Sequence, residues 1–283
     1  MTRQTVLVVG ASGTVGSEIV KLLAAQGHKV RATTSKKTSA QPKDGVEQVH
    51  VNLVTGEGIS KAFDGVDRAF LLSPPGHADQ YKILAPLIQE AKRRGLKKVV
   101  LMTAMGANAA DTPFRRAEIE LEKSGLAYNI VRPNWFMQNF NTYWIHGILE
   151  QGKILLPAGT AKTSFIDARD ISAVVAKLLT SDDLNNRDFD LTGPQAIDHS
   201  EVAKEISSST GKKVAYEEIE PSTLKKGLVA AGFPEDYVDF LILIFGFLRE
   251  GYNAAVTDSV KRVLGRAPIE FKKYAKDYKE AWA

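Results

Sequence analysis

Short apolar segments alternate with amphipathic segments along the first half of the chain. The apolar segments are rich in β-branched residues, as is typical of strands buried in a parallel sheet. They predict strands at Thr5–Val9, Lys29–Thr34, Val46–Val51, Asp67–Ser73, Lys97–Thr103 and Ala127–Arg132. Helical periodicity is found between them, at Ser17–Ala25, Ala78–Arg94 and Thr112–Ser124. This alternation predicts an α/β fold with a doubly wound parallel sheet.

A glycine-rich turn links the first predicted strand to the first predicted helix. Gly10, Gly13 and Gly16 stand three residues apart in it. Gly10 permits a sharp turn, Gly13 leaves room for a pyrophosphate against the backbone, and Gly16 lets the helix pack close to the strand. The N–H groups and the positive dipole end of the helix then face the phosphates.

We therefore predict a dinucleotide-binding turn near the N-terminus. The expected phosphate contacts are Gly10, Ser12, Gly13, Thr14, Val15 and Gly16. The alternative is a tight strand-to-helix turn in another class of α/β protein. The position of the motif, directly after a strand and at the start of a helix, favours the dinucleotide.

The end of the second predicted strand carries no carboxylate. A site that prefers NAD(H) holds the ribose 2′-hydroxyl with an acidic side chain near this point, whereas residues 30–42 contain none. Hydroxyl groups at Thr34 and Ser35 and the ammonium group of Lys36 suit a 2′-phosphate instead. We expect NADP(H) in preference to NAD(H). The alternative is that the lysines here are merely solvated loop charges.

Further site residues follow from the sheet itself, because ligands of such sheets bind at the carboxyl ends of the strands. Additional cofactor contacts are expected from Ser73, Pro74, Thr103 and Pro133. Candidate substrate contacts are Met105, Phe114, Asn134 and Phe136. Because this set is poor in charge, we expect a flat apolar acceptor such as a quinone or a dye.

The pattern changes after Pro133. The segment 134–140 is aromatic and amide-rich, which suits core packing under a loop and a pocket wall beside the cofactor equally well. A helix over Ile171–Leu179 is predicted to begin with Asp170 as its N-cap, a structural role. A short strand is expected at Asp188–Leu191.

The C-terminal part of the chain reads as mostly helical from Ser200 onward. The longest apolar run, Phe240–Leu248, is too short to span a bilayer and is predicted to be a buried helix. No internal repeat or low-complexity segment interrupts this part of the chain.

Composition narrows the function classes. The chain has no cysteine, which excludes disulfides, thiolate metal sites and cysteine nucleophiles and suits a reducing cytosol. No signal-peptide pattern is visible, so we expect a cytoplasmic protein without a membrane partner. The net charge of +4 comes from scattered residues, which is weak support for nucleic-acid binding. The five histidines lie far apart and predict no metal site.

The motifs together resemble a known family. The matching segments are Gly10–Gly16, Ser124–Leu126, Val131–Met137, Phe165–Asp170 and Val263–Pro268. In their order and spacing they resemble the NmrA-like group of atypical short-chain dehydrogenases/reductases, most closely the quinone-oxidoreductase and triphenylmethane-reductase type.

The resemblance implies a Rossmann-like domain, residues 1–192, and a smaller, mainly helical substrate domain, residues 193–283. It also implies binding of NADP(H), with the substrate in a cleft that residues 134–160 partly line.

Two departures from the family pattern bear on function. Family members commonly carry an arginine where this chain has Ser35, followed by Lys36. The Tyr-x-x-x-Lys pair of short-chain dehydrogenases is replaced by Phe114 and Glu118. A phenyl ring has no proton to donate, and a carboxylate does not lower the pKa of a phenol as an ammonium group does. We therefore assign no catalytic residue.

Two functions stay open. The favoured one is an NADP(H)-dependent reductase whose acceptor takes hydride with little acid help, so that positioning carries much of the rate. The other is a non-catalytic sensor of NADP(H) that acts through a protein partner.

Overall fold

The computed structural model describes residues 3–37 and 41–283, so part of the polar loop after the second strand lies outside the described residues. The chain forms two compact units. Unit 1 comprises Met1–Pro75, Asp79–Arg132 and Ile171–Asp190; unit 2 comprises Gly76–Ala78, Pro133–Asp170 and Leu191–Ala283. Residues 134–170, expected in the first domain, therefore group with the C-terminal residues, because their apolar side chains pack into the core of unit 2.

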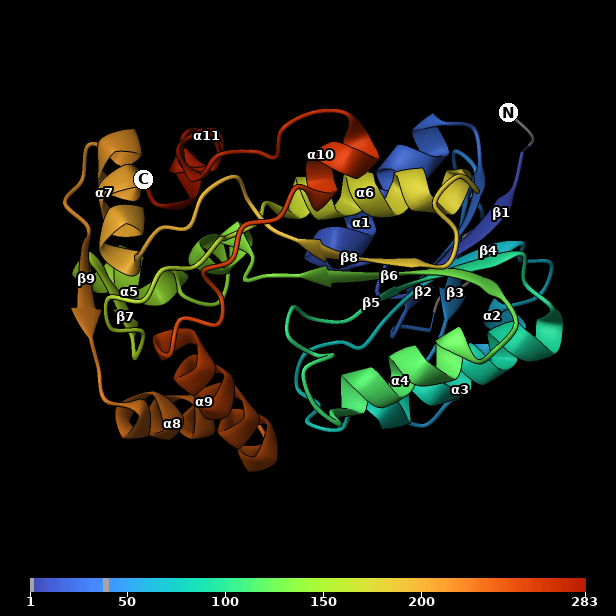
Figure 1. Cartoon of the computed structure of the whole chain (residues 1–283), viewed down its shortest axis with the longest axis horizontal. Helices are drawn as coiled ribbons and strands as arrows, with labels where there is room; N and C mark the ends of the chain where they lie inside the picture. The colour runs from blue at the N-terminus through green and yellow to red at the C-terminus, as the bar shows by residue number, and fades with distance from the viewer. Residues whose placement is uncertain (1–2, 38–40) are drawn as a thin grey trace. The chain divides into compact units, whose positions relative to one another are not determined.

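Unit 1 is built on a seven-stranded sheet with the order β3-β2-β1-β4-β5-β6-β8 (Figure 1). Its strands are β1 (Thr5–Val8), β2 (Lys29–Thr34), β3 (Val46–His50), β4 (Arg68–Leu72), β5 (Lys98–Met102), β6 (Ala127–Pro133) and β8 (Arg187–Leu191). The neighbouring pairs from β3 to β6 are parallel. The predicted strands and the doubly wound order are confirmed, with strand ends within one residue of expectation.

Helices cover both faces of this sheet. One face carries α2 (Ile59–Ala62), α3 (Gln80–Arg94) and α4 (Pro113–Glu122), and the other carries α1 (Thr14–Ala25) and α6 (Ala168–Thr180) (Figure 1). Successive side chains of a strand point to opposite faces, so the core under α2–α4 takes every second strand residue. Those residues include Leu7, Val9, Ala69, Leu71, Val99 and Leu101.

Unit 2 combines a small sheet with short helices. The sheet pairs β7 (Lys153–Leu156) in parallel with β9 (Ala215–Glu218), a strand within the stretch expected to be mostly helical. The other elements are η1 (Met137–Asn141), α5 (Ile145–Gln151), α7 (His199–Thr210), α8 (Pro221–Ala230), α9 (Glu235–Arg249), α10 (Ser259–Leu264), α11 (Phe271–Asp277) and η2 (Lys279–Ala281).

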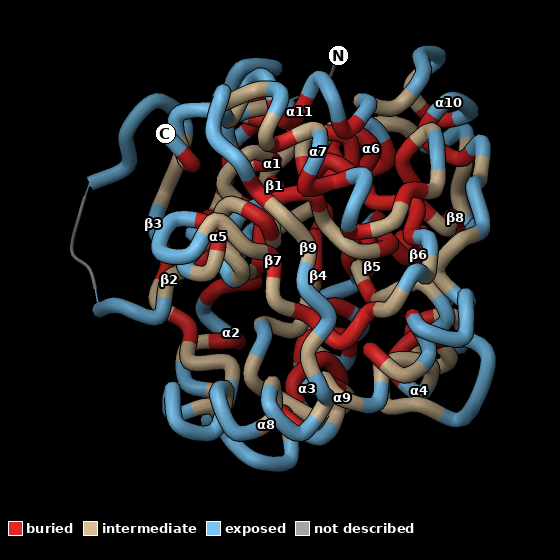
Figure 2. The backbone as a smooth tube through the Cα atoms, turned by 90° about the vertical axis from the view of Figure 1, so that its left-hand side faces the viewer, coloured by how far each residue is buried: buried red, intermediate tan, exposed pale blue. Residues whose placement is uncertain are grey.

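The apolar run in α9 is helical as predicted, but the expectation that it is buried is wrong. Phe245 and Leu248 are buried, whereas Leu243 and Phe247 are 56% and 46% exposed. The neighbouring α8 buries none of its residues (Figure 2), so this helix pair covers its apolar side chains only in part. Within residues 3–37 and 41–283, no helix has the length and apolar character to cross a membrane.

The N-cap assignment at Asp170 is also wrong. The helix begins earlier, at Ala168, and the Asp167 carboxylate accepts a hydrogen bond from the Arg169 N–H at 2.8 Å, as an N-cap does. Asp170 lies inside the first turn and is buried. Its carboxylate accepts from the Ile269 N–H at 2.6 Å and pairs with Arg266 at 2.7 Å, so its role is to fix the segment after α10.

Candidate functional site

The turn between β1 and α1 owes its shape to two of its three glycines. Gly10 has φ +70°, a left-handed conformation that residues with side chains rarely adopt. A Cβ atom on Gly16 would lie 2.2 Å from the Gly10 carbonyl oxygen. Gly13 is different: it is exposed, its φ is −84°, and an added Cβ would lie 3.3 Å from the Gly10 carbonyl oxygen, a tight contact that a small shift relieves. The fold therefore requires Gly10 and Gly16, whereas it requires a glycine at position 13 much less.

The start of α1 presents backbone donors at this turn. The first N–H groups of a helix have no partner within the helix, and no described side chain caps this end. Ser12, Gly13 and Thr14 are exposed. The hydroxyl of Ser172 in α6 donates to the Val15 carbonyl oxygen at 3.1 Å and so holds the first turn from α6. Open donors at the positive end of a helix dipole suit an anionic group such as a phosphate.

The end of β2 lies directly beside the glycine turn. The hydroxyl of Thr33 accepts a hydrogen bond from the Gly10 N–H at 3.0 Å, a contact that the sequence analysis missed. Thr34 ends the strand, and its hydroxyl accepts from the Lys36 N–H at 3.1 Å. Ser35 and Lys36 are exposed. Their side chains are therefore accessible to a ligand that lies over this end of the sheet.

Two neighbouring cations, Arg31 and Lys37, lie against other groups of unit 1. Lys37 lies 3.6 Å from Glu57. Arg31 donates to the carbonyl oxygens of Asp64 and Lys61 at 2.7 and 3.0 Å. Within the described part of the chain, Lys36 takes part in none of the ion pairs of this region. It is thus the cation at the end of β2 that is most available to a 2′-phosphate.

The next candidates stand at the carboxyl ends of β4, β5 and β6. Leu72 pairs with Met102, and Met102 with Val131, so Ser73 and Thr103 follow their strands at the same level. Ser73 is half-buried, and its hydroxyl points to the carbonyl of the next residue, Pro74, at 3.4 Å. Pro133 is the last residue of β6. Residues that the sequence analysis selected for cofactor contact thus share one edge of the sheet.

Thr103 is bonded to a buried charge network. Its hydroxyl donates to Glu118 Oε1 at 2.7 Å. Arg132 donates to both oxygens of the same carboxylate, from Nε at 2.8 Å and from Nη2 at 2.9 Å. Arg115 adds a third donor to Glu118 at 3.0 Å. Glu118 is therefore held in place as the partner of Arg132.

The charge states in this network follow from these contacts. Burial by itself would raise the pKa of Glu118, but the hydrogen bonds from Arg132 and Thr103 outweigh it and hold that pKa below its ordinary value. The same pairing raises the pKa of Arg132 despite its burial. Both groups are ionised at neutral pH.

The ion pair between Glu118 and Arg132 was not predicted from the sequence. There, Glu118 was considered only as the residue that replaces a lysine. A signal was present, because Arg132 interrupts an apolar strand and Glu118 lies between Ala117 and Leu121 on the buried side of α4. A charge in such a position needs a partner. The sequence does not show which of the charged residues form an ion pair with each other.

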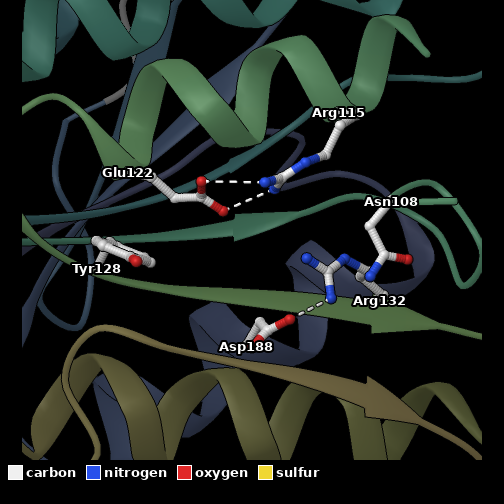
Figure 3. A pocket seen from close by; sticks show the side chains of 6 residues that line it. All are labelled: Asn108, Arg115, Glu122, Tyr128, Arg132 and Asp188. Carbon is white, nitrogen blue, oxygen red and sulfur yellow. Dashed lines mark hydrogen bonds and ion pairs between the residues drawn. The ribbon is translucent and has the colours of Figure 1, made fainter. Parts of the chain in front are cut away.

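A polar pocket of about 190 Å³ opens along the same network (Figure 3). It is lined by Asn108, Arg115, Glu122, Tyr128, Arg132 and Asp188. Figure 3 shows Arg115 from α4 paired with Glu122, and Arg132 from β6 paired with Asp188 of β8. Both guanidinium groups are thus already neutralised, and the pocket walls do not include the predicted cofactor or substrate residues.

The predicted substrate residues fall into both units. Met105, in the loop after β5, and Phe114, in the first turn of α4, belong to unit 1 and are half-buried. Phe114 packs against the core under α2–α4. Phe136 belongs to unit 2 and is also half-buried. All three retain some exposed surface.

Asn134 is buried, and its side-chain amide is hydrogen-bonded to other residues of unit 2. Its amide nitrogen donates to Ser164 Oγ and to the Asn253 carbonyl oxygen, both at 2.8 Å, and its amide oxygen accepts from Asn253 Nδ2 at 2.9 Å. In the same segment, Met137 and Phe140 are fully buried. For these residues the core-packing interpretation of segment 134–140 is correct.

A family model and a curated relative match the whole chain. The model of the NmrA-like family matches residues 2–276. The NAD(P)H azoreductase of Xenophilus azovorans is 34% identical over 285 residues, covering 98% of this chain and 99% of that protein.

Solved structures share the fold. Triphenylmethane reductase of Citrobacter sp., complexed with NADP(H), superposes with a TM-score of 0.81 at 22% identity, covering 97% of this chain and 99% of that one. The NADPH-dependent quinone oxidoreductase QOR2 of Escherichia coli, complexed with NADPH, gives 0.80 at 19% identity, covering 96% and 99%. NmrA, a negative transcriptional regulator, in complex with NADP, gives 0.77 at 17% identity, covering 99% and 96%.

Proposed function

The chain belongs to the NmrA-like family, and we propose that it is an oxidoreductase that passes hydride from NADPH to a flat apolar acceptor such as a quinone or a dye. Gly13 is the observation that carries this proposal. The backbone conformation at this exposed position does not require a glycine, and an added Cβ would need only a small shift of the Gly10 carbonyl oxygen, 3.3 Å away. The missing side chain therefore fits a need for space above the turn. A pyrophosphate in that space would accept hydrogen bonds from the N–H groups that begin α1.

The preference for NADPH over NADH rests on the end of β2. The hydroxyl groups of Thr34 and Ser35 and the ammonium group of Lys36, at the end of β2, suit a 2′-phosphate. Arg31 donates to backbone carbonyl groups and Lys37 lies 3.6 Å from Glu57, so Lys36 is the cation that we assign to the 2′-phosphate. No carboxylate lies between residues 30 and 42 to hold a free 2′-hydroxyl.

The acceptor is proposed to contact Met105 and Phe114 of unit 1, whose half-buried apolar surfaces suit a flat aromatic molecule. Bound NADPH supplies the hydride, and a proton from water completes the reduction: a quinone, for example, gains one hydride and one proton to become a hydroquinone. Phe114 stands where a tyrosine acid would act and holds no proton to give. An acceptor that delocalises the added electrons is therefore favoured, and the name of the Xenophilus relative supports a dye.

A second function, a sensor of NADP(H) read by a protein partner, is favoured by one observation. Phe114 has no acidic proton, and Glu118 is hydrogen-bonded to Arg132, so neither residue is free to act as an acid. A sensor of this kind must bind its partner differently in the cofactor-bound and cofactor-free states.

Single-turnover oxidation of bound NADPH distinguishes the two functions. The purified chain is loaded with NADPH and mixed with naphthoquinones, triphenylmethane dyes and azo dyes, and the absorbance of the reduced nicotinamide is followed. We expect at least one aromatic acceptor to oxidise bound NADPH faster than free NADPH. If none does, while NADPH alters the capture of a protein from a lysate, the sensor function replaces the reductase.

A further inference from the structure

Thr103 stands at the carboxyl end of β5 with its hydroxyl proton already used. Its hydroxyl donates to Glu118 Oε1 at 2.7 Å, and its backbone N–H donates to the Val131 carbonyl oxygen at 3.0 Å. The residue follows the last residue of β5 and is 6% exposed. A threonine hydroxyl has one proton and two lone pairs.

The direction of the Thr103–Glu118 hydrogen bond follows from the charge on Glu118. That carboxylate is fully buried and accepts from Arg132 on both of its oxygens. Two guanidinium groups, those of Arg132 and Arg115, keep it ionised. An ionised carboxylate has no proton to offer. Thr103 must therefore be the donor.

The network also prevents this arrangement from reversing. Arg132 is itself buried and is held on its far side by Asp188 (Figure 3). Rotation of the Thr103 hydroxyl proton away from Glu118 would leave an oxygen of a buried carboxylate with one donor fewer, which is costly. The Thr103 hydroxyl thus has lone pairs, and no proton, for a further partner.

The order of the strands indicates which part of a dinucleotide would meet Thr103. The candidate 2′-phosphate contacts follow β2, and the candidate pyrophosphate contacts follow β1. Next in the sheet come β4 and then β5. Neighbouring strands lie about 4.8 Å apart, so β5 stands about 10 Å beyond the pyrophosphate turn. A dinucleotide that crosses the strand ends in this order reaches β5 with its nicotinamide riboside half.

We propose that Thr103 accepts a hydrogen bond from an N–H or O–H donor of the nicotinamide riboside half of NADPH, and that Glu118 is the positioning residue that makes Thr103 an acceptor. This inference rests on the proposed function. The matching donors are the carboxamide N–H and the ribose hydroxyl. An oxidised acceptor such as a quinone offers only lone pairs and would be disfavoured at this point, so Thr103 selects for the cofactor rather than for the substrate.

Calorimetric titration tests this assignment without any turnover. The wild-type chain, Thr103→Val and Thr103→Ser are titrated with NADPH and with adenosine 2′,5′-bisphosphate, which lacks the nicotinamide half. We expect Thr103→Val to weaken NADPH binding about three- to tenfold, as the loss of one hydrogen bond does. Thr103→Ser retains the hydroxyl and should bind NADPH like the wild type, and all three should bind the bisphosphate equally.

A cofactor analogue identifies the donor. The 3-acetylpyridine analogue of NADP⁺ has no carboxamide N–H. If the carboxamide is the donor, the wild type binds this analogue more weakly than NADP⁺ and Thr103→Val does not distinguish the two. If a ribose hydroxyl is the donor, the wild type binds both equally and Thr103→Val weakens both.

Two results would overturn the proposal: unchanged NADPH binding by Thr103→Val, or equal weakening of NADPH and the bisphosphate. A wild-type chain that binds no NADPH would contradict the proposed function itself and this inference with it.

Discussion

Gly16 approaches Gly10 so closely that a Cβ atom on Gly16 would lie 2.2 Å from the Gly10 carbonyl oxygen. We expect Gly16→Ala to lower the free energy of unfolding by about 1–3 kcal/mol, because the helix must move away from the turn. Urea denaturation followed by circular dichroism measures this loss. Gly227→Ala in α8 is the control, because its Cβ would meet nothing within 4 Å. Equal stability of the two variants would disprove the close approach.

Gly13→Val should affect NADPH binding more than it affects the stability of the fold. Gly13 is exposed and has an extended backbone that any residue adopts, but an added Cβ would lie 3.3 Å from the Gly10 carbonyl oxygen. The free energy of unfolding should therefore fall by less than in Gly16→Ala, where the corresponding distance is 2.2 Å. The valine side chain would fill the space proposed for the pyrophosphate, and NADPH should no longer bind at concentrations that saturate the wild type. Calorimetry on the folded variant measures this. Normal NADPH affinity in folded Gly13→Val would remove the main support for the proposed function.

Much of unit 1 could be predicted from the sequence because its strands are buried apolar runs bounded by polar residues. β9 could not, because Ala215–Glu218 is only half apolar and pairs with a strand far away in sequence. The start of α6 was misplaced because Asp167 and Asp170 are both good caps by residue type. Asp170 instead lies in the first turn and pairs with Arg266, a long-range contact that no local pattern encodes.

Lys36 should decide the choice between NADPH and NADH. Replacing Lys36 with alanine removes a cation at the end of β2 that has no ion pair among residues 3–37 and 41–283, so we expect NADPH affinity to fall about three- to tenfold, as for one exposed charge-assisted contact. NADH affinity should stay the same. The matched control is Lys37→Ala, since Lys37 lies 3.6 Å from Glu57. Competition titrations at low and high salt test this, and an equal effect of both substitutions on NADPH would refute the role of Lys36.

Glu118→Gln should be strongly destabilising. The substitution removes the buried one of the carboxylates that pair with Arg132 and leaves Asp188, which is partly exposed, as a remaining partner. Breaking a buried ion pair costs up to about 3–5 kcal/mol. Glu122→Gln is the control, because Glu122 is a partly exposed partner of Arg115 and should change stability by less than about 1 kcal/mol. Chemical denaturation at pH 7 compares them. Similar stability of the two variants would show that the Glu118–Arg132 pair contributes little.

The same pair predicts a response to acid. The pKa of Glu118 is lower in the folded chain than its ordinary value, 4.5. Its stabilising effect is therefore complete above pH 4.5 and is lost as the pH falls through the lowered pKa. The stability difference between the wild type and Glu118→Gln should shrink in that acidic range. A difference that stays constant down to pH 3 would contradict the assignment of Glu118 as the ionised partner.

His199, at the start of α7, should make unit 2 sensitive to mild acid. Its side chain is fully buried, with ring centroids of Phe140, Phe165 and Tyr216 at 5.9, 5.4 and 5.5 Å. Neither ring nitrogen has a hydrogen-bond partner among the described residues. Burial lowers the pKa of His199 from 6.5 to about 4, against the weaker opposite effect of the Asp198 charge.

His199 takes up a proton at a lower pH in the folded chain than in the unfolded chain. The unfolded chain protonates His199 near pH 6.5, whereas the folded chain keeps it neutral until about pH 4. Stability is therefore complete above pH 6.5 and falls as the pH drops toward 4, by up to about 1.4 kcal/mol per pH unit. His199→Phe, with a ring that suits the same aromatic surroundings, should lose this part of the slope. Urea denaturation of both proteins between pH 7 and pH 5 measures the difference, and identical slopes would show that His199 is already protonated or solvated in the folded chain.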